Sequence, residues 1–215
     1  TFVVYLFSCN ISEILVVGLA TLAGAPLPLL PLQILFLNLV TDVFPALALG
    51  VGPGAQDLMQ RRPRPANERI LTRAHWRRIA WYGALMSASV LGAMAAAHYL
   101  LQLDGTRTLT VSFCTLALAQ LWHVFNMRET APGGFRLRNE ITTNPWIWGA
   151  LALCLALVLA AVYQPTLAEV LQLAHPGARG WMLILAMSLL PLALAPLSSI
   201  GKLVYRDGNQ SRSAT

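Results

Sequence analysis

Residues 79–101 read IAWYGALMSASVLGAMAAAHYLL, a stretch of 23 residues that contains no Asp, Glu, Lys or Arg. A helix needs about 20 predominantly apolar residues to cross the hydrocarbon core of a bilayer, so this run predicts a transmembrane helix. The runs near 108–127, 145–163 and 181–201 are also free of charged side chains. A β-barrel is disfavoured, because the runs exceed about 10 residues and do not alternate with a period of two.

Two more apolar runs, near 2–23 and 27–50, bring the set to six. The whole chain of 215 residues is 56% hydrophobic and only 11% charged, whereas soluble domains average about 25% charged residues. The sequence therefore predicts an all-α fold, a polytopic, multi-pass membrane bundle of six transmembrane helices. This bundle is expected to occupy residues 1–205, followed by a polar tail at 206–215.

The basic residues predict the orientation of the bundle. Of the fifteen Lys and Arg residues, seven lie between the second and third runs, three between the fourth and fifth, and three in the tail. The loops expected on the opposite side hold only Arg107 and Arg179. The positive-inside rule then places both chain ends in the cytoplasm. This topology accounts for the pI near 9.8 without nucleic acid as a partner, and membrane lipid is the expected neighbour.

Cysteine and histidine do not form a recognisable metal motif. Cys9, Cys114 and Cys154 stand alone in three different runs, and their odd number argues against a disulfide framework or a zinc site. We interpret them as small packing residues. His123 lies one helical turn from Gln120 and is the one histidine placed to approach an ion path through the membrane.

Two carboxylates sit inside the apolar runs, and they are the only acidic residues there. Glu13 has Asn10 one turn before it, and Asp42 has Asn38 and Thr41 at spacings of four and one. A charge at the bilayer centre costs about 2.5–3.5 kcal/mol on insertion scales, so such residues usually mark an ion or proton path. Carboxylates flanked by neutral oxygen donors predict a site for a hard cation such as Ca²⁺. The alternative is a proline kink whose polar side chains bond between helices.

The first two runs are expected to form a tight antiparallel hairpin. Residues 24–31 include three prolines, which cannot continue a helix. Glu13 and Asp42 lie at similar distances along the chain from this turn and so reach similar depth in the membrane. Pro45 removes the hydrogen bond to the Thr41 carbonyl, which predicts an interrupted helix lining a cavity or ion site.

These residues also carry a resemblance to a known family. Asn10-Ile-Ser-Glu13 before the proline-rich turn, Asn38-Leu-Val-Thr41-Asp42 after it, and the segment 57–65 resemble the type II P-type cation ATPases. The most similar branch is the calcium pumps. The resemblance implies that the whole chain corresponds to membrane helices five to ten of such a pump.

The resemblance also implies a set of cation ligands. One calcium site would use the side chains of Asn10, Glu13, Thr41 and Asp42. The second would use Asn38 and share Asp42. Sodium/potassium pumps carry an acid where this chain has Asn38, which favours a calcium-like interpretation.

One further ligand position departs from the family pattern. Where the eighth helix of the calcium pumps supplies a glutamate, this chain has Gln120. The exchange removes a negative charge, which could weaken the first site, alter the number of ions or protons handled, or change the ion.

The catalytic machinery of the family is missing from this sequence. There is no Asp-Lys-Thr-Gly-Thr phosphorylation motif, so no catalytic or cofactor-binding residue is predicted, and the fragment alone is expected to have no activity. The chain opens directly on apolar residues, which predicts a piece of a longer protein. Mg²⁺ and ATP would act only in the full-length protein, with the missing N-terminal catalytic and membrane parts as partners.

The predicted function is thus the cation-binding transmembrane part of an ATP-driven pump for Ca²⁺, an integral protein of a bacterial plasma membrane. Two alternatives stay open at this point. The first is a pump of the same family for Mg²⁺, Mn²⁺, Na⁺ or H⁺. The second is a non-enzymatic membrane remnant that binds a partner.

Overall fold

The computed structural model describes residues 2–51, 71–127 and 144–195. Within these ranges every regular element is helical, and six helical stretches are long and apolar enough to cross a membrane. The described part of the chain confirms the expected all-α class with six candidate spans. In chain order the elements are α1 (Phe2–Leu22), α2 (Pro31–Leu37), the π-helical turn η1 (Asn38–Asp42), α3 (Val43–Val51), α4 (Arg73–Ala95), the π-helical turn η3 (Ala96–Leu100), α5 (Gly105–His123), the 3-10 turn η4 (Val124–Met127), α7 (Pro145–Tyr163), α8 (Pro165–Val170) and α9 (Gly177–Leu194).

The turn between α1 and α2 is fixed by glycine and proline. Gly24 adopts a φ of 65°, a left-handed conformation that glycine reaches without a Cβ clash. Pro31 occupies the start of α2, where its missing N–H costs no helical hydrogen bond. The Gln33 side chain accepts a hydrogen bond from the Leu30 N–H at 3.0 Å. The start of the second span is therefore set by its local sequence.

The second span is continuous but not regular. It runs over Pro31–Ala48 through α2, η1 and α3, and the π turn η1 replaces an α-helical turn in its middle. Pro45 follows in α3 and contributes no N–H to the backbone ladder. π-Helical backbone is rare, and it occurs mostly as single turns inside α-helices, frequently at functional sites. The interruption expected near Asp42 thus takes the form of a π turn, and the chain continues as a helix past Pro45.

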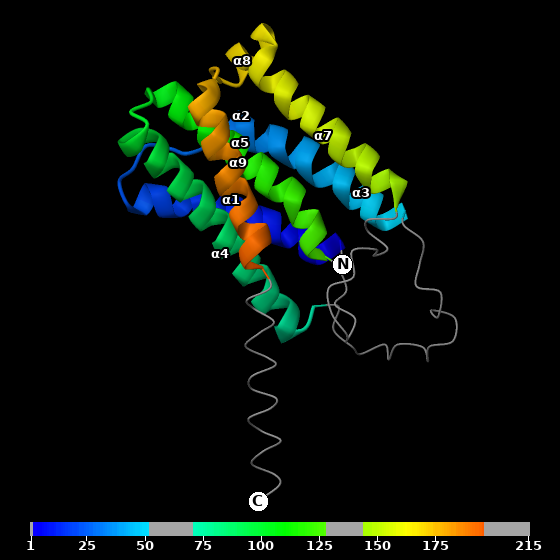
Figure 1. The fold of residues 1–215 in the computed structure, drawn as a ribbon. Coiled ribbons are helices and arrows are strands. Elements are labelled where there is room, and N and C mark those ends of the chain that lie inside the picture. The colour runs from blue at the N-terminus through cyan, green and yellow to red at the C-terminus, as the bar shows by residue number, and fades with distance from the viewer. Residues whose placement is uncertain (1, 52–70, 128–143, 196–215) are drawn as a thin grey trace, which may run out of the picture.

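Helix α5 is the central element of the bundle. It packs against α4, α7 and α9, which surround it in Figure 1. Of the six candidate spans, the one that contains α5 is the most enclosed: 83% of an 18-residue stretch of it is buried inside the protein. Side chains on α5 therefore meet other helices on nearly every side.

Helices α1 and α4 approach each other closely at a glycine. A Cβ built on Gly83 would lie only 2.8 Å from Cγ2 of Ile11. One turn further along α4, the Ser87 hydroxyl donates to the Ser12 carbonyl at 3.1 Å. Small residues of this kind allow close backbone approach between membrane helices, so the Gly83 contact fixes how α4 packs on α1.

The third span begins earlier than its apolar run. Helix α4 starts at Arg73 rather than near residue 79, because the Thr72 side chain caps it and accepts from the His75 N–H at 3.4 Å. An N-cap hydroxyl stabilises a helix start irrespective of hydropathy. Most of the expected basic loops and the tail expected at 206–215 lie outside the described residues.

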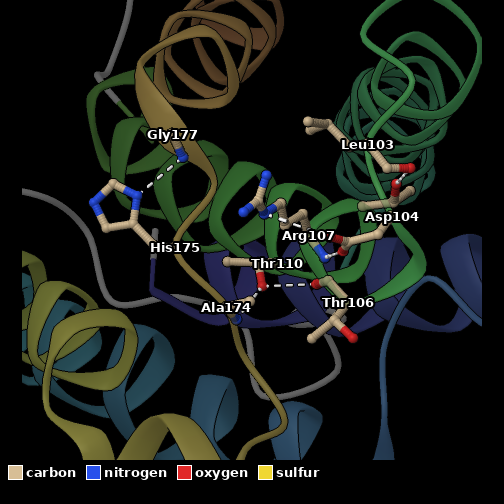
Figure 2. Close-up of polar contacts among 9 residues, drawn as sticks. Leu103, Asp104, Thr106, Arg107, Thr110, Ala174, His175 and Gly177 are labelled. Atoms are coloured by element: carbon tan, nitrogen blue, oxygen red, sulfur yellow. Dashed lines mark hydrogen bonds and ion pairs between the residues drawn. The ribbon is translucent and has the colours of Figure 1, made fainter.

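The end of the bundle near α8 is held by side-chain to backbone hydrogen bonds, several of which Figure 2 shows. Asp104 caps α5 by accepting from the Arg107 N–H at 2.8 Å. Thr110 accepts from the Ala174 N–H at 2.9 Å, which ties the segment after α8 to α5. This segment is thereby fastened to the helical bundle.

The same segment is also tied to the second span. The Gln33 amide, which is fully buried, donates to the Leu171 carbonyl at 2.8 Å. Buried side-chain bonds of this kind satisfy carbonyls that lie beyond a helix end. The start of the second span is therefore fixed both by its own turn and by the chain that follows α8.

Candidate cation site

The two acidic residues predicted to line an ion path lie in the interior of the bundle. Glu13 on α1 and Asp42 on η1 are each only 4% exposed. The amide nitrogen of Asn10 donates to Oδ2 of Asp42 at 3.2 Å, which connects the two elements directly. No lysine or arginine occurs in residues 2–51 to neutralise these carboxylates. Since buried charges are normally paired, the pair creates a local demand for protons or a cation.

Gln120 joins this group from the central helix α5. Its side chain is fully buried, and its Nε2 donates to Oε1 of Glu13 at 3.0 Å. Its Oε1 accepts a hydrogen bond from the Thr41 hydroxyl at 2.6 Å. The amide therefore bridges a carboxylate of α1 and a hydroxyl of η1.

Two oxygen atoms of the site have no hydrogen-bond partner among the described residues. They are Oδ1 of Asn38 and Oδ1 of Asp42, and both atoms are buried. A buried acceptor without a partner costs about 1–3 kcal/mol, so such atoms in a native protein call for an explanation. Oxygen acceptors at the two ends of one π turn are suited to a hard cation, which takes carboxylate and amide oxygens as ligands.

Tyr5 is a site residue that the sequence analysis missed. Its hydroxyl, fully buried, donates to the Thr41 carbonyl at 2.8 Å and lies 3.3 Å from the Gln120 carbonyl. Pro45 has no N–H for the Thr41 carbonyl, and that carbonyl therefore needs another donor. This requirement was the available signal, because Tyr5 is one of the few strong donors in the first apolar run.

His123 packs on Tyr5, and its hydrogen bonds and ring contacts within the described residues do not include either carboxylate. Its ring stacks on Tyr5 with centroids 5.7 Å apart and meets Tyr82 edge-on at 4.6 Å. Its Nδ1 is 3.3 Å from the Asn126 amide. Within the described ranges no group of three His, Cys, Asp or Glu side chains could hold a metal ion, so the site is one of mixed carboxylate, amide and hydroxyl oxygens.

A membrane bundle that buries two carboxylates and unpaired oxygens between its helices is typical of proteins that move ions across membranes. Comparison with known proteins agrees with this class. Residues 26–200 match the family model described as "Cation transporting ATPase, C-terminus", and the chain belongs to this family. The expected C-terminal region of a P-type cation ATPase is thereby confirmed.

Several similar bacterial proteins are named calcium-transporting ATPases. The chain is 36% identical over 194 residues to the calcium-transporting ATPase of Bacillus subtilis, an alignment covering 90% of this chain and 21% of that protein. It is 29% identical over 215 residues to calcium-transporting ATPase 1 of Bacillus cereus, covering 93% of this chain and 24% of the relative. It is also 32% identical over 177 residues to calcium-transporting ATPase 1 of Lactococcus lactis, covering 82% of this chain and 19% of that protein. The chain thus spans about a fifth of the length of these relatives.

Proposed function

We propose that this chain is the cation-binding membrane part of an ATP-driven Ca²⁺ pump, equivalent to membrane helices five to ten of a type II P-type ATPase. The observation that carries the proposal is a pair of buried oxygens, on Asn38 and Asp42, that have no partner in the described part of the chain and lie beside a second buried carboxylate, Glu13. Ca²⁺ takes six to eight oxygen ligands and tolerates irregular geometry. The names of the relatives support Ca²⁺ as the transported ion.

In this proposal Asp42 is the ligand shared by two adjacent sites. Asn10, Glu13 and Thr41 complete the first site with it, and Asn38 completes the second. Asn10 now turns its amide nitrogen towards Asp42, so cation binding requires this amide to rotate and present its oxygen. The missing helices of the full-length protein supply the ligands that these side chains leave unfilled.

Gln120 makes the two proposed sites unequal. Its amide bonds both Glu13 and Thr41, which are ligands of the first site only. A cation entering that site must break both hydrogen bonds, and it meets an amide in place of a carboxylate. The second site keeps the unpartnered oxygens. We therefore infer that the second site binds more tightly than the first.

Transport in the proposed pump follows alternating access, with the site near the membrane midplane and opened to each side in turn. Phosphorylation by ATP, with Mg²⁺, takes place in the parts of the full-length protein that precede this chain and tilts the helices around Asp42. The protein is proposed to lie in a bacterial plasma membrane with both chain ends cytoplasmic. Its partners are membrane lipid, the transported cation and the remainder of the same pump.

The test is cation-dependent phosphorylation of the purified full-length protein by ATP, measured separately with Ca²⁺, Mn²⁺, Na⁺ and varied Mg²⁺ and pH. Formation of the phosphoenzyme at micromolar Ca²⁺, but not with the other cations at equal concentration, is the expected result. Activation by Mn²⁺, Na⁺ or protons alone would keep the family and replace the ion. A phosphoenzyme that forms equally without any added cation would contradict the proposed site.

A further inference from the structure

Helix α7 contacts the π turn through a cysteine. The Cys154 thiol donates to the Val40 carbonyl at 3.1 Å, and both residues lie in the interior, with Cys154 fully buried. Cys154 lies midway along α7, and Val40 lies midway along η1 between Asn38 and Asp42. The sequence analysis treated Cys154 as a packing residue. The structure instead gives its thiol a backbone partner on the element that carries the candidate site.

The Val40 carbonyl has a reason to need this partner. A π turn shifts backbone bonding from the fourth to the fifth following residue. Pro45 is the fifth residue after Val40 and the fourth after Thr41, and it has no N–H. The missing N–H of Pro45 therefore removes one backbone donor within reach of these two carbonyls. Tyr5 supplies a donor to Thr41, and Cys154 supplies one to Val40.

A second contact fastens α7 along the same span. Asn144 caps α7 by accepting from the Trp146 N–H at 3.0 Å, and its amide nitrogen donates to the Ala48 carbonyl on α3 at 3.2 Å. Figure 1 shows α7 running alongside α3, and the two helices are in contact. Two carbonyls of the second span, that of Val40 in η1 and that of Ala48 in α3, thus accept hydrogen bonds from side chains of α7 and its N-cap.

We propose that Cys154 is a positioning residue for the cation site, acting through the Val40 carbonyl to keep η1 in its π-turn geometry. This inference rests on the proposed function for what the site binds. Asn38 and Asp42 flank Val40, and their Oδ1 atoms are buried with no partner in residues 2–51, 71–127 and 144–195, so the shape of this turn sets the distance between two proposed ligands. Without the thiol, the Val40 carbonyl loses a buried side-chain donor, and the turn is held less firmly in its π geometry.

The experiment compares Cys154→Ala, Cys154→Ser and Cys114→Ala in the full-length protein. Cys114 is a second fully buried cysteine, located on α5, and serves as the matched control. Cys154→Ala should raise the cation concentration for half-maximal phosphorylation about fivefold, the effect of about 1 kcal/mol, with the maximal level unchanged. Cys154→Ser retains a donor and should stay within about twofold of the wild type, as should Cys114→Ala.

Infrared spectroscopy of the S–H stretch tests the contact separately from cation activation. The wild type should show a red-shifted S–H component that disappears in Cys154→Ala and persists in Cys114→Ala. Absence of this component, or equal cation dependence of Cys154→Ala and wild type, would overturn the role of Cys154. If the proposed function itself were wrong, the result would be distinguishable, because the wild-type protein would then form a phosphoenzyme that does not depend on the cation.

Discussion

At the scale of single residues, each polar side chain of the site has a partner on another helix or an atom left open. Gln120 connects Glu13 to Thr41, and Asn10 holds one oxygen of Asp42. The second oxygen of Asp42 has no partner among the described residues. Because a carboxylate in an apolar interior is costly unless it is compensated, the function of these residues is best tested by exchanging one atom at a time.

Asp42→Asn in the full-length protein should raise the Ca²⁺ concentration for half-maximal phosphorylation by about 100-fold or more. The exchange conserves the shape of the side chain and removes the charge, and the affinity of calcium sites depends strongly on the number of charged ligands. The measurement is phosphoenzyme formation against Ca²⁺ concentration.

Glu169→Gln is the matched control for that exchange. Glu169 is exposed on α8, away from the site, so the loss of its charge should leave the Ca²⁺ dependence unchanged. A folded Asp42→Asn protein with wild-type Ca²⁺ dependence would assign the two carboxylates to structural hydrogen bonding instead.

Gln120→Glu should lower the Ca²⁺ concentration for half-maximal phosphorylation by about tenfold. The new carboxylate would face Glu13, now 3.0 Å from the amide nitrogen, so it adds a charged ligand and repels Glu13 until a cation enters. The same protein should therefore show a larger rise in Tm on Ca²⁺ addition than the wild type.

The control for the added charge is Gln102→Glu, since Gln102 is exposed outside the spans. It should change neither the Ca²⁺ dependence nor the Ca²⁺-induced rise in Tm. If Gln120→Glu weakened Ca²⁺ activation, the assignment of this α5 position to the first site would be wrong.

At the scale of elements, the α1–α4 contact has little spare room at Gly83. A methyl group on Gly83 would meet the branched Ile11 side chain at 2.8 Å, and Ile11 cannot turn away easily because its χ1 angle is restricted in a helix. Gly83→Ala should therefore lower the free energy of unfolding by about 1–3 kcal/mol, seen as a lower Tm in detergent.

Gly149→Ala provides the comparison, because a Cβ on Gly149 in α7 meets no atom within 4 Å. Alanine also favours helix formation over glycine, so this variant should keep or slightly raise the Tm. Equal Tm values for the two variants would show that α4 can move away from α1 without loss of stability.

Elements of this fold differ in how far the sequence could predict them. Long apolar runs, four of them free of charged residues, identified the spans, because a segment needs about 20 predominantly apolar residues to cross a bilayer. The hairpin turn was visible from its prolines, and the α4 start was missed because a cap at Thr72 overrides hydropathy. The π turn η1 could be expected only as some interruption before Pro45, since its form depends on which neighbours supply donors.

The candidate site shows the same division. Asn10, Glu13, Asn38, Thr41 and Asp42 were predicted from their spacing in apolar runs, and Gln120 from the family resemblance; their role as cation ligands stays a prediction. Tyr5 and Cys154 were not found as contacts, because each acts on a carbonyl more than thirty residues away in the chain. No periodicity encodes such a contact, which arises only when the helices pack.

At the scale of the whole molecule, the distribution of basic residues predicts which faces meet the cytoplasm. Arg62→Cys and Glu169→Cys, each made in a full-length protein whose native cysteines are all replaced by serine, place one thiol in each set of loops. A membrane-impermeant reagent applied outside intact cells should label the second variant and spare the first. Labelling of the first variant from outside would reverse the proposed topology.

The enclosure of α5 has a consequence for how the protein is made. Its apolar sequence is interrupted by polar side chains that other helices cover, among them Thr108, Thr110, Ser112, Thr115, Gln120 and His123. During synthesis α5 enters the bilayer before α7 and α9 have been made, and lipid is a poor solvent for the polar side chains of α5. Helices α1 and α4 are already in place by then, and α4 packs directly on α5. We therefore expect α5 to insert beside a helix pair that is already in the membrane, and a protein from which α4 is deleted should leave α5 without the neighbour that makes its insertion favourable.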